Sequence, residues 1–267
     1  GTPEPQEPSL ADLTIPEGYT IEQIAQAVGQ LQGEFKEPLT ADAFLAKVQD
    51  DNFISQEVAK YPNLLESLPT KESGVRYRLE GYLFPATYSI KESTTIESLV
   101  DEMLAAMDKT LTPHYSAIKS KNLTVNELLT IASLVEKEGA KTEDRKLIAG
   151  VFYNRLNLGM PLQSNIAILY AQGKLGQNIS LADDAGIDTS INSPYNVYTK
   201  PGLMPGPVDS PSQDAIEASI NQTKSENLYF VANVTDGKVY YAVTQEEHDR
   251  NVAEHVNSKL TQNSSSN

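Results

Sequence analysis

The 267-residue chain contains no cysteine and no tryptophan. Without cysteine there can be no disulfide, no thiolate nucleophile and no thiolate metal ligand. Only three histidines occur, at positions 114, 248 and 255. His248 and His255 fall in a C-terminal segment, where a surface or half-buried histidine is more common than a metal ligand or a base. We therefore expect neither a bound metal nor a cofactor.

Long apolar runs are also absent, because none approaches the roughly 20 residues that a helix needs to cross a bilayer. The chain begins with Gly1 rather than Met, so we expect that an N-terminal part has been removed and that any membrane anchor lies outside this chain. Basic residues are scarce as well, with 21 against 36 acidic ones and a formal charge of -15. That surplus repels phosphates and argues against a nucleic-acid partner.

The remaining composition, 39% hydrophobic and 21% charged, is typical of a globular protein. The sequence predicts four consecutive parts. Residues 1–11 form a proline-rich linker, 12–72 a small α/β unit, 73–260 a larger mixed domain, and 261–267 a disordered Ser/Asn-rich tail. In the small unit, the segment from Leu13 to Thr20 predicts a short strand and a turn, and helices follow at Ile21 and from Ala41 to about Gln49.

The larger domain mixes strands and helices without regular alternation, which favours the α+β class. An aromatic strand and turn is expected at Arg76–Pro85, and a hairpin through Asp236-Gly237 joins strand-like runs at 228–231 and 239–243. Capping residues and apolar periodicity predict the helices, which cover 96–107, 124–138 with Gly139 as the stop, 143–157 with Gly159 as the stop, and a last one capped by Thr244 and Glu247.

No phosphate-binding glycine loop, nucleophile elbow or zinc-binding helix occurs, so carboxylates remain as the candidate reagents. The helix that starts at Thr124 ends in Glu136-Lys137-Glu138. Desolvation beside its apolar face would raise a carboxyl pKa, as a proton donor at working pH requires. Glu136 and Glu138 lie on opposite flanks of that face, while Lys137 points away from it. Helical periodicity alone does not choose between the two glutamates.

A second feature is the segment from Asp183 to Pro211, which is too long for a simple connection. It contains Tyr195, Asn196 and Tyr198 among prolines and glycines. Aromatic faces and side-chain amides are the groups that bind sugars. The segment is thus a candidate carbohydrate-binding loop, although a rigid structural loop would have a similar composition.

At these residues the sequence resembles the endolytic murein transglycosylase family, also called the YceG-like family, and its streptococcal members in particular. The resemblance covers roughly residues 76–259. The turn at residues 16–20 more weakly resembles the LysM-like subdomain of that family. Five blocks in order carry the resemblance: Leu79–Pro85, Ile131–Glu138, Val151–Leu156, Ser193–Tyr198 and Gly202–Pro207.

The resemblance implies a small LysM-like N-terminal subdomain and a larger YceG-like α+β catalytic domain. It makes Glu138, the second glutamate of the triplet, the catalytic residue, and it gives Tyr198 a supporting role. Glu80, Gln163, Tyr195 and Asn196 match motif positions of the family less specifically, and the resemblance places them around the substrate cleft. One departure is visible, because Asn165 and Ile166 stand where the family commonly has Asp-Pro. A role that needs a carboxylate at position 165 is therefore not expected here.

The implied reaction is non-hydrolytic cleavage of the β-1,4 bond between N-acetylmuramic acid and N-acetylglucosamine inside nascent glycan strands, leaving 1,6-anhydromuramoyl ends. Glu138 would act first as acid and then as base. A hydrolytic muramidase-type glycosidase, with Glu136 or Glu80 as second carboxylate, and a non-catalytic peptidoglycan-binding division scaffold are the alternatives. The resemblance further implies single-pass anchoring in the cell membrane, this chain on the extracytoplasmic side, and contact with wall-synthesis or division proteins.

Overall fold

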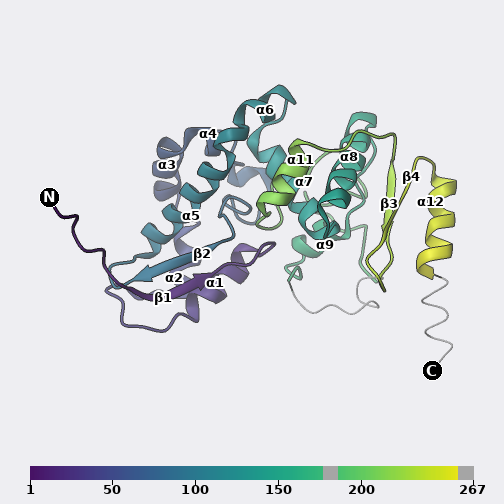
Figure 1. The fold of residues 1–267 in the computed structure, drawn as a ribbon. Helices are drawn as coiled ribbons and strands as arrows, with labels where there is room; N and C mark the ends of the chain where they lie inside the picture. The colour runs from purple at the N-terminus through teal and green to yellow at the C-terminus, as the bar shows by residue number, and fades with distance from the viewer. Residues whose placement is uncertain (177–185, 258–267) are drawn as a thin grey trace.

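The structure is a computed structural model that describes residues 1–176 and 186–257. Helices predominate in it, and two short antiparallel ladders complete an α+β fold, which confirms the predicted class (Figure 1). The strands are β1 Ser9–Thr14, β2 Thr87–Lys91, β3 Tyr229–Ala232 and β4 Val239–Ala242. The α-helices are α1 Ile21–Gly29, α2 Ala41–Lys47, α3 Asp51–Lys60, α4 Pro62–Leu65, α5 Ile96–Leu111, α6 Tyr115–Ser120, α7 Val125–Glu138, α8 Thr142–Leu158, α9 Asn165–Ala171, α11 Gln213–Ile220 and α12 Gln245–Val252. Short helical turns occupy Lys71–Ser73, Thr112–His114 and Ala253–Asn257.

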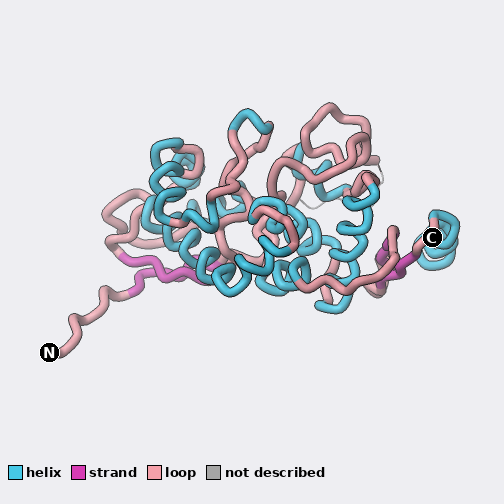
Figure 2. Tube along the Cα trace, turned by 90° about the horizontal axis from the view of Figure 1, so that it is seen from above, coloured by secondary structure: helices cyan, strands magenta, loops and turns pink. Residues whose placement is uncertain are grey.

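The two ladders lie at opposite ends of an elongated molecule, with the helices between them (Figure 2). At one end β1 pairs with β2, and Leu13 stands opposite Tyr88. At the other end β3 pairs with β4, followed by α12. The β1–β2 ladder joins residues on both sides of position 72, while the division of the chain into domains at that position stays a prediction, as does the LysM-like character of residues 12–72.

The N-terminal helix α1 forms as its sequence predicts. Thr20 accepts a hydrogen bond from the backbone N–H of Gln23, and the Gln23 side chain accepts one from the N–H of Thr20. This reciprocal cap satisfies two of the free N–H groups at the start of a helix. The apolar residues at helical spacing, Ile21, Ile24, Ala25 and Val28, are all buried, so α1 packs this face into the first hydrophobic core.

The prediction of a strand at Arg76–Pro85 is wrong. This segment runs through turns, and the strand that follows it, β2, begins only at Thr87. Gly81 has φ +88°, a left-handed conformation that interrupts an extended strand. In addition, residues 79–83 are all buried, so the alternation of a half-buried strand is missing. The apolar and aromatic content of the segment reflects burial in the core rather than strand formation.

Helix α7 runs through the middle of the protein, between two hydrophobic cores. Its predicted capping box is confirmed, since Thr124 accepts from the N–H of Glu127 and Glu127 accepts from the N–H of Thr124. Every residue from 128 to 135 is buried. Leu128 and Leu129 belong to the core shared with α1–α5, whereas Leu134 belongs to the core shared with α8 and α9. A helix buried on all sides is a rigid support for whatever its last turn carries.

The other predicted helices and the hairpin are also confirmed. Helix α8 ends at Gly159 with φ +69°, and the hairpin turns at Gly237 with φ +73°. Thr244 accepts from the N–H of Glu247 and so caps α12. The predicted tail at 261–267 and part of the long loop, residues 183–185, lie outside the described residues.

Candidate active site

Arg145 of α8 fixes the last turn of α7. Its Nη2 donates to Glu136 Oε2 at 2.8 Å, and its Nε donates to the carbonyl oxygen of Gly139 at 2.8 Å. The second oxygen of Glu136 accepts from the backbone N–H of Ser212 at 2.7 Å. The Glu136 side chain is only 7% exposed. Both oxygens of this carboxylate therefore serve to hold the structure together.

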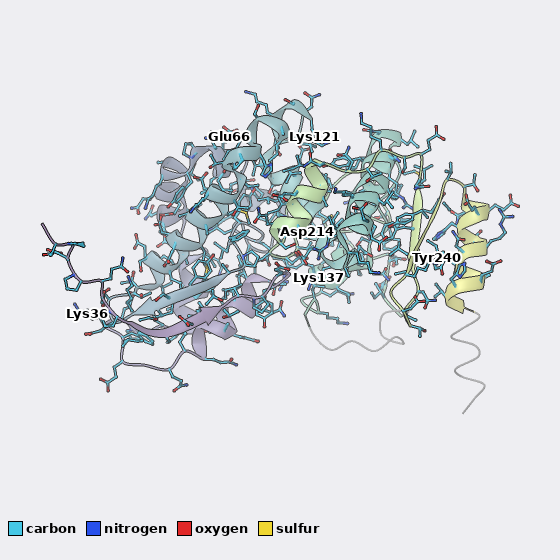
Figure 3. All side chains as sticks on the ribbon, in the orientation of Figure 1. Lys36, Glu66, Lys121, Lys137, Asp214 and Tyr240 are labelled. Carbon is cyan, nitrogen blue, oxygen red and sulfur yellow. The ribbon has the colours of Figure 1, made fainter. Side chains whose placement is uncertain are left out.

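The three residues of the Glu-Lys-Glu triplet point in three directions. Lys137 reaches the N-terminal turn, where its Nζ lies 3.1 Å from the position that a Cβ on Gly18 would occupy. Figure 3 shows Lys137 in the middle of the molecule. Glu138 follows Glu136 by two positions, about 200° around the helix, and its carboxylate opens into a separate pocket.

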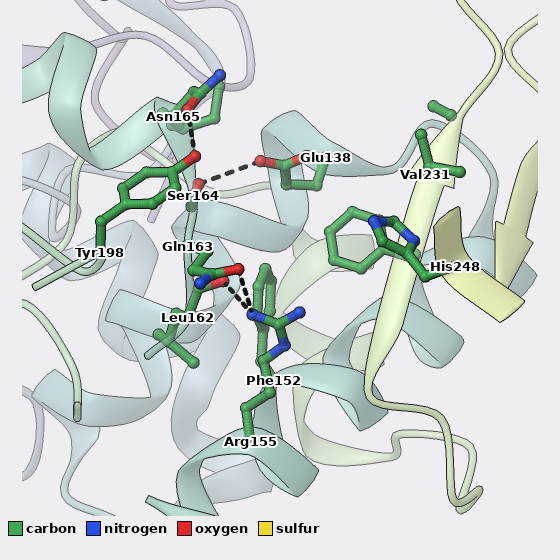
Figure 4. Close-up of a pocket in the computed structure, with 13 residues that line it drawn as sticks. Glu138, Phe152, Arg155, Leu162, Gln163, Ser164, Asn165, Tyr198, Val231 and His248 are labelled. Carbon is green, nitrogen blue, oxygen red and sulfur yellow. Dashed lines mark hydrogen bonds between the residues drawn. The ribbon is translucent and has the colours of Figure 1, made fainter. Parts of the chain in front are cut away.

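This pocket has a volume of about 310 Å³ and is bordered by segments far apart in the sequence. In Figure 4, Glu138 lies between Tyr198 and Asn165 on one side and Val231 and His248 on the other. Oε1 of Glu138 accepts a hydrogen bond from the Ser164 hydroxyl at 3.1 Å. Among the described residues that line the pocket, Glu138 is the one acidic side chain.

The polar wall of the pocket is the segment that leads into α9. Gln163 has φ +58°, unusual for a residue with a side chain, and its N–H donates to the carbonyl of Val197 at 3.0 Å. The hydroxyl of Tyr198 donates to Oδ1 of Asn165. The amide oxygen of Asn165 accepts here as a carboxylate oxygen would, so the contact needs no acidic residue at position 165.

Arg155 of α8 connects the polar wall with the segment just before β3 on the other side. Its Nη1 donates to the carbonyls of Pro161 at 2.9 Å and Leu162 at 3.2 Å, and its Nε donates to the carbonyl of Leu228 at 2.6 Å. Burial lowers the pKa of Arg155, but an arginine keeps its charge at neutral pH. This one cation therefore hydrogen-bonds to the backbone on both sides of the pocket.

Tyr195 and Asn196 lie behind the pocket rather than in it, with 2% and 1% of their surface exposed. The hydroxyl of Tyr195 accepts from the N–H of Arg76 at 3.3 Å. Oδ1 of Asn196 accepts from the N–H of Tyr198 at 2.9 Å, and its Nδ2 donates to the carbonyl of Ile191 at 2.8 Å. Both residues shape the loop that presents Tyr198.

Glu80 lies apart from the pocket, at the junction with the N-terminal unit. Its Oε2 accepts from the N–H of Ile21, the first residue of α1, at 2.8 Å. Burial raises the pKa of Glu80 to about 8. Of the six residues predicted for the site, Glu138, Gln163 and Tyr198 line the pocket, Tyr195 and Asn196 support its loop, and Glu80 joins two parts of the fold.

Sequence reasoning did not place the β3 hairpin or α12 at this site. His248 of α12 lines the pocket and stacks on Tyr229, with the ring centroids 5.0 Å apart. Phe230 packs edge-on against Phe152 at 5.7 Å. No local motif marks these residues, because their place depends on the return of the C-terminal hairpin to α8. Within residues 1–176 and 186–257, no three His, Asp or Glu side chains come together as a metal site requires.

The fold and site define a mixed α+β protein in which a buried central helix presents one glutamate to a tyrosine-bordered pocket. The sequence profile of the YceG-like family matches residues 3–254, and this chain belongs to that family. It is 85% identical over 260 residues to an endolytic murein transglycosylase of Streptococcus pneumoniae serotype 2 strain D39, covering 97% of this chain and 47% of that protein. It is 34% identical over 248 residues to an endolytic murein transglycosylase of Bacillus subtilis strain 168, covering 92% of this chain and 66% of that protein.

A solved structure agrees with the fold. The crystal structure of a yceG-like protein from Listeria monocytogenes superimposes with a TM-score of 0.79 at 35% identity, covering 91% of this chain and 76% of that one. The chain spans about half the length of the streptococcal relative. Of the helices that the structure describes, none is long and apolar enough to cross a membrane.

Proposed function

We propose that this chain is the catalytic part of an endolytic murein transglycosylase. It cleaves the β-1,4 bond between N-acetylmuramic acid and N-acetylglucosamine within glycan strands and leaves 1,6-anhydromuramoyl ends. The observation that carries the proposal is the solitary carboxylate of Glu138 in a pocket whose walls are otherwise neutral or basic among the described residues. The names of the streptococcal and Bacillus relatives support the same reaction.

A hydrolytic glycosidase is the alternative enzyme, and it needs a second carboxylate across the scissile bond. Neither predicted partner is available for that task. Both oxygens of Glu136 are bound by Arg145 and the backbone of Ser212. Glu80 is buried against the N-terminus of α1 and does not line the pocket. A reaction in which one carboxylate serves twice fits this arrangement better.

In the proposed mechanism, protonated Glu138 donates its proton to the departing glycosidic oxygen as the bond from that oxygen to C1 of the muramoyl residue breaks. The C6 hydroxyl of the same residue then attacks C1, and its proton passes to the Glu138 carboxylate. The enzyme returns to its starting state, and no water enters the products. Such proton transfers typically contribute about 10² to 10⁴ in rate.

Neighbouring groups suit this role of Glu138. The hydroxyl of Ser164, which also lines the pocket, donates to Oε1 and restrains the carboxyl there. Tyr198, held by Asn165 and by the backbone contact of Asn196, supplies an aromatic face and a hydroxyl next to the site. Gln163 adds a side-chain amide at the pocket rim. We assign these residues to binding and positioning of the sugar.

The test is mass spectrometry of uncrosslinked glycan strands after incubation with the chain or with its Glu138→Gln variant. The expected result is anhydromuramoyl ends from the wild-type chain and none from the variant. Glu143→Gln, which changes an exposed glutamate near the start of α8, is the matched control and should behave as wild type.

Other outcomes would point to the alternatives. Reducing ends in place of anhydro ends would identify a hydrolase. If neither the wild-type chain nor the Glu138→Gln variant cleaved the strands although both bound them, the chain would be a non-catalytic peptidoglycan-binding scaffold.

The cellular setting is part of the proposal. We place the chain on the outer face of the cytoplasmic membrane, anchored by a single span outside these residues, near proteins of wall synthesis or division. Fractionation of the full-length protein, with protease added to intact protoplasts, checks this placement. Protection of this domain from the protease would contradict it.

A further inference from the structure

The pocket meets strand β3 along its edge. Three consecutive residues, Phe230, Val231 and Ala232, line the pocket. Side chains alternate between the two faces of a strand, so a pocket that faced one side of β3 would contact every second residue. Contact with all three means that the pocket runs along the backbone. In Figure 4, β3 passes the pocket on the side opposite Tyr198.

The hydrogen-bond register shows which backbone groups face that edge. Asn233 donates its N–H to the carbonyl of Lys238 at 2.8 Å, in the register that pairs Ala232 with Val239. Bonded and non-bonded pairs alternate along an antiparallel ladder. Residues 229, 231 and 233 therefore bond to β4, and the intervening Phe230 and Ala232 turn their N–H and C=O groups to the opposite edge. Within the described chain no third strand pairs there.

Side chains of α8 satisfy the backbone just before this edge begins. Nδ2 of Asn154 donates to the carbonyls of Ser225 and Asn227, and Arg155 donates to the carbonyl of Leu228. These contacts end at Leu228. The outward groups of Phe230 and Ala232 follow directly and border the pocket, so they are placed to bind a ligand rather than to support the fold.

We propose that this free edge binds the 2-acetamido group of the substrate, with the backbone N–H of Ala232 donating to the acetyl carbonyl oxygen. The inference rests on the proposed function, because it takes a glycan of N-acetylated sugars as the occupant. The edge is continuous with the pocket of Glu138. Since the acetamido group is on C2, next to the anomeric carbon where cleavage occurs, it lies close to the reacting atoms.

A peptide stem is a less suitable occupant of the same edge. An extended peptide gains its affinity from several consecutive backbone hydrogen bonds to a strand, whereas β3 has four residues and offers outward groups at only two of them. The stem is also attached through C3, further from the anomeric carbon than the acetamido group. One donor beside the pocket matches one acetyl oxygen.

The test compares Ala232→Pro with Ala232→Val. Proline removes the outward N–H, and it is tolerated on an edge strand where that N–H makes no ladder bond. Valine adds similar bulk and keeps the N–H. Both changes are made in the Glu138→Gln chain, and calorimetry measures binding of glycan strands freed of peptide stems, either native or chemically N-deacetylated. Thermal unfolding confirms that both variants fold.

The expected result is binding of N-acetylated strands about tenfold weaker for the proline variant than for the valine variant, the loss of about one hydrogen bond. On deacetylated strands the two variants should bind equally. N-deacetylation leaves a positively charged amine on the sugar. Because the two variants are compared on the same substrate, the effect of that charge on binding cancels. Equal binding by both variants on N-acetylated strands, the same loss on both substrates, or no binding at all would overturn the proposal.

This outcome is separable from the proposed function. If the wild-type chain cleaves strands but the proline and valine variants do not differ, only the acetamido site is refuted. If the variants differ as expected but no anhydromuramoyl ends form, the acetamido site stands and the transglycosylase proposal fails.

Discussion

Nη2 of Arg145 lies 2.8 Å from Oε2 of Glu136, in an ion pair that joins α8 to the last turn of α7. Arg145 also pairs with Asp214 of α11 at 2.8 Å, and Asp214 is labelled in Figure 3. Three helices thus meet at the guanidinium of Arg145. The glutamate that it binds, Glu136, precedes the proposed catalytic Glu138 by two residues. The same pair distinguishes the two glutamates of the triplet, since Arg145 and the backbone of Ser212 bind Glu136, whereas the Ser164 hydroxyl binds Glu138 at the pocket.

Replacing Arg145 by Met should leave the Glu136 carboxylate buried without its partner. We expect the free energy of unfolding to fall by about 3–5 kcal/mol, because an uncompensated buried charge is costly. Urea denaturation measures the change. The double variant Arg145→Met/Glu136→Leu removes both charges and should recover much of the loss. A single variant as stable as wild type would show that the pair does not hold the turn.

The contact between Tyr198 and Asn165 should tolerate an acid at position 165. Asn165→Asp keeps an oxygen acceptor for the Tyr198 hydroxyl, so we expect cleavage rates within about threefold of wild type, a difference below 1 kcal/mol. Asn165→Ala and Tyr198→Phe each break the contact and should slow cleavage by roughly tenfold, the effect of one hydrogen bond. Equal rates for Asn165→Ala and wild type would remove this contact from the site.

Gly81 should be intolerant of any side chain. It has φ +88°, and a Cβ there would lie 2.2 Å from Cβ of Pro207. We expect Gly81→Ala to lower the free energy of unfolding by roughly 2–4 kcal/mol through backbone strain and overpacking together.

Gly202 provides the matched control, because it has φ +92° but nothing within 4 Å of its Cβ position. Gly202→Ala should cost only the backbone strain, roughly 1 kcal/mol. Thermal or urea unfolding of both variants separates the two contributions. Equal losses at the two positions would mean that Pro207 yields to the new side chain.

Glu80 should make the protein less stable as the pH rises. Its pKa is raised from 4.5 to about 8, chiefly by burial. The folded state therefore holds a proton that the unfolded state releases above pH 4.5. The resulting stabilisation is complete below that pH and is lost as the pH rises towards 8, by up to roughly 5 kcal/mol.

The variant Glu80→Gln cannot ionise and keeps an acceptor for the N–H of Ile21. We expect its free energy of unfolding to depend less on pH than that of wild type between pH 5 and 8.5, and to exceed it at the upper end. Asp209 is present in both proteins, and its pKa is raised mainly by burial and also by the charge of Glu80, so the difference between the two curves reports Glu80 together with its repulsion of Asp209. Parallel pH curves would contradict the prediction.

Local signals in the sequence determined most of the secondary structure. The capping boxes at Thr20 and Thr124, the stop at Gly159 and the hairpin turn at Gly237 were all predictable, because each depends on hydrogen bonds or backbone angles within a few residues. The segment at Arg76–Pro85 was not, since its apolar residues are buried by distant parts of the chain and its φ at Gly81 is set by a close approach to Pro207.

By itself the sequence predicted that the reagent is a carboxylate, with Glu136 and Glu138 as the candidates on α7. Helical periodicity separates these two by direction but cannot say what each direction meets. The tertiary structure decided that, by bringing Arg145 and Ser212 to Glu136 and Ser164 to Glu138. Only the return of the C-terminal hairpin to α8 placed His248 and the free edge of β3 at the pocket, because contacts between segments so distant in sequence leave no local pattern.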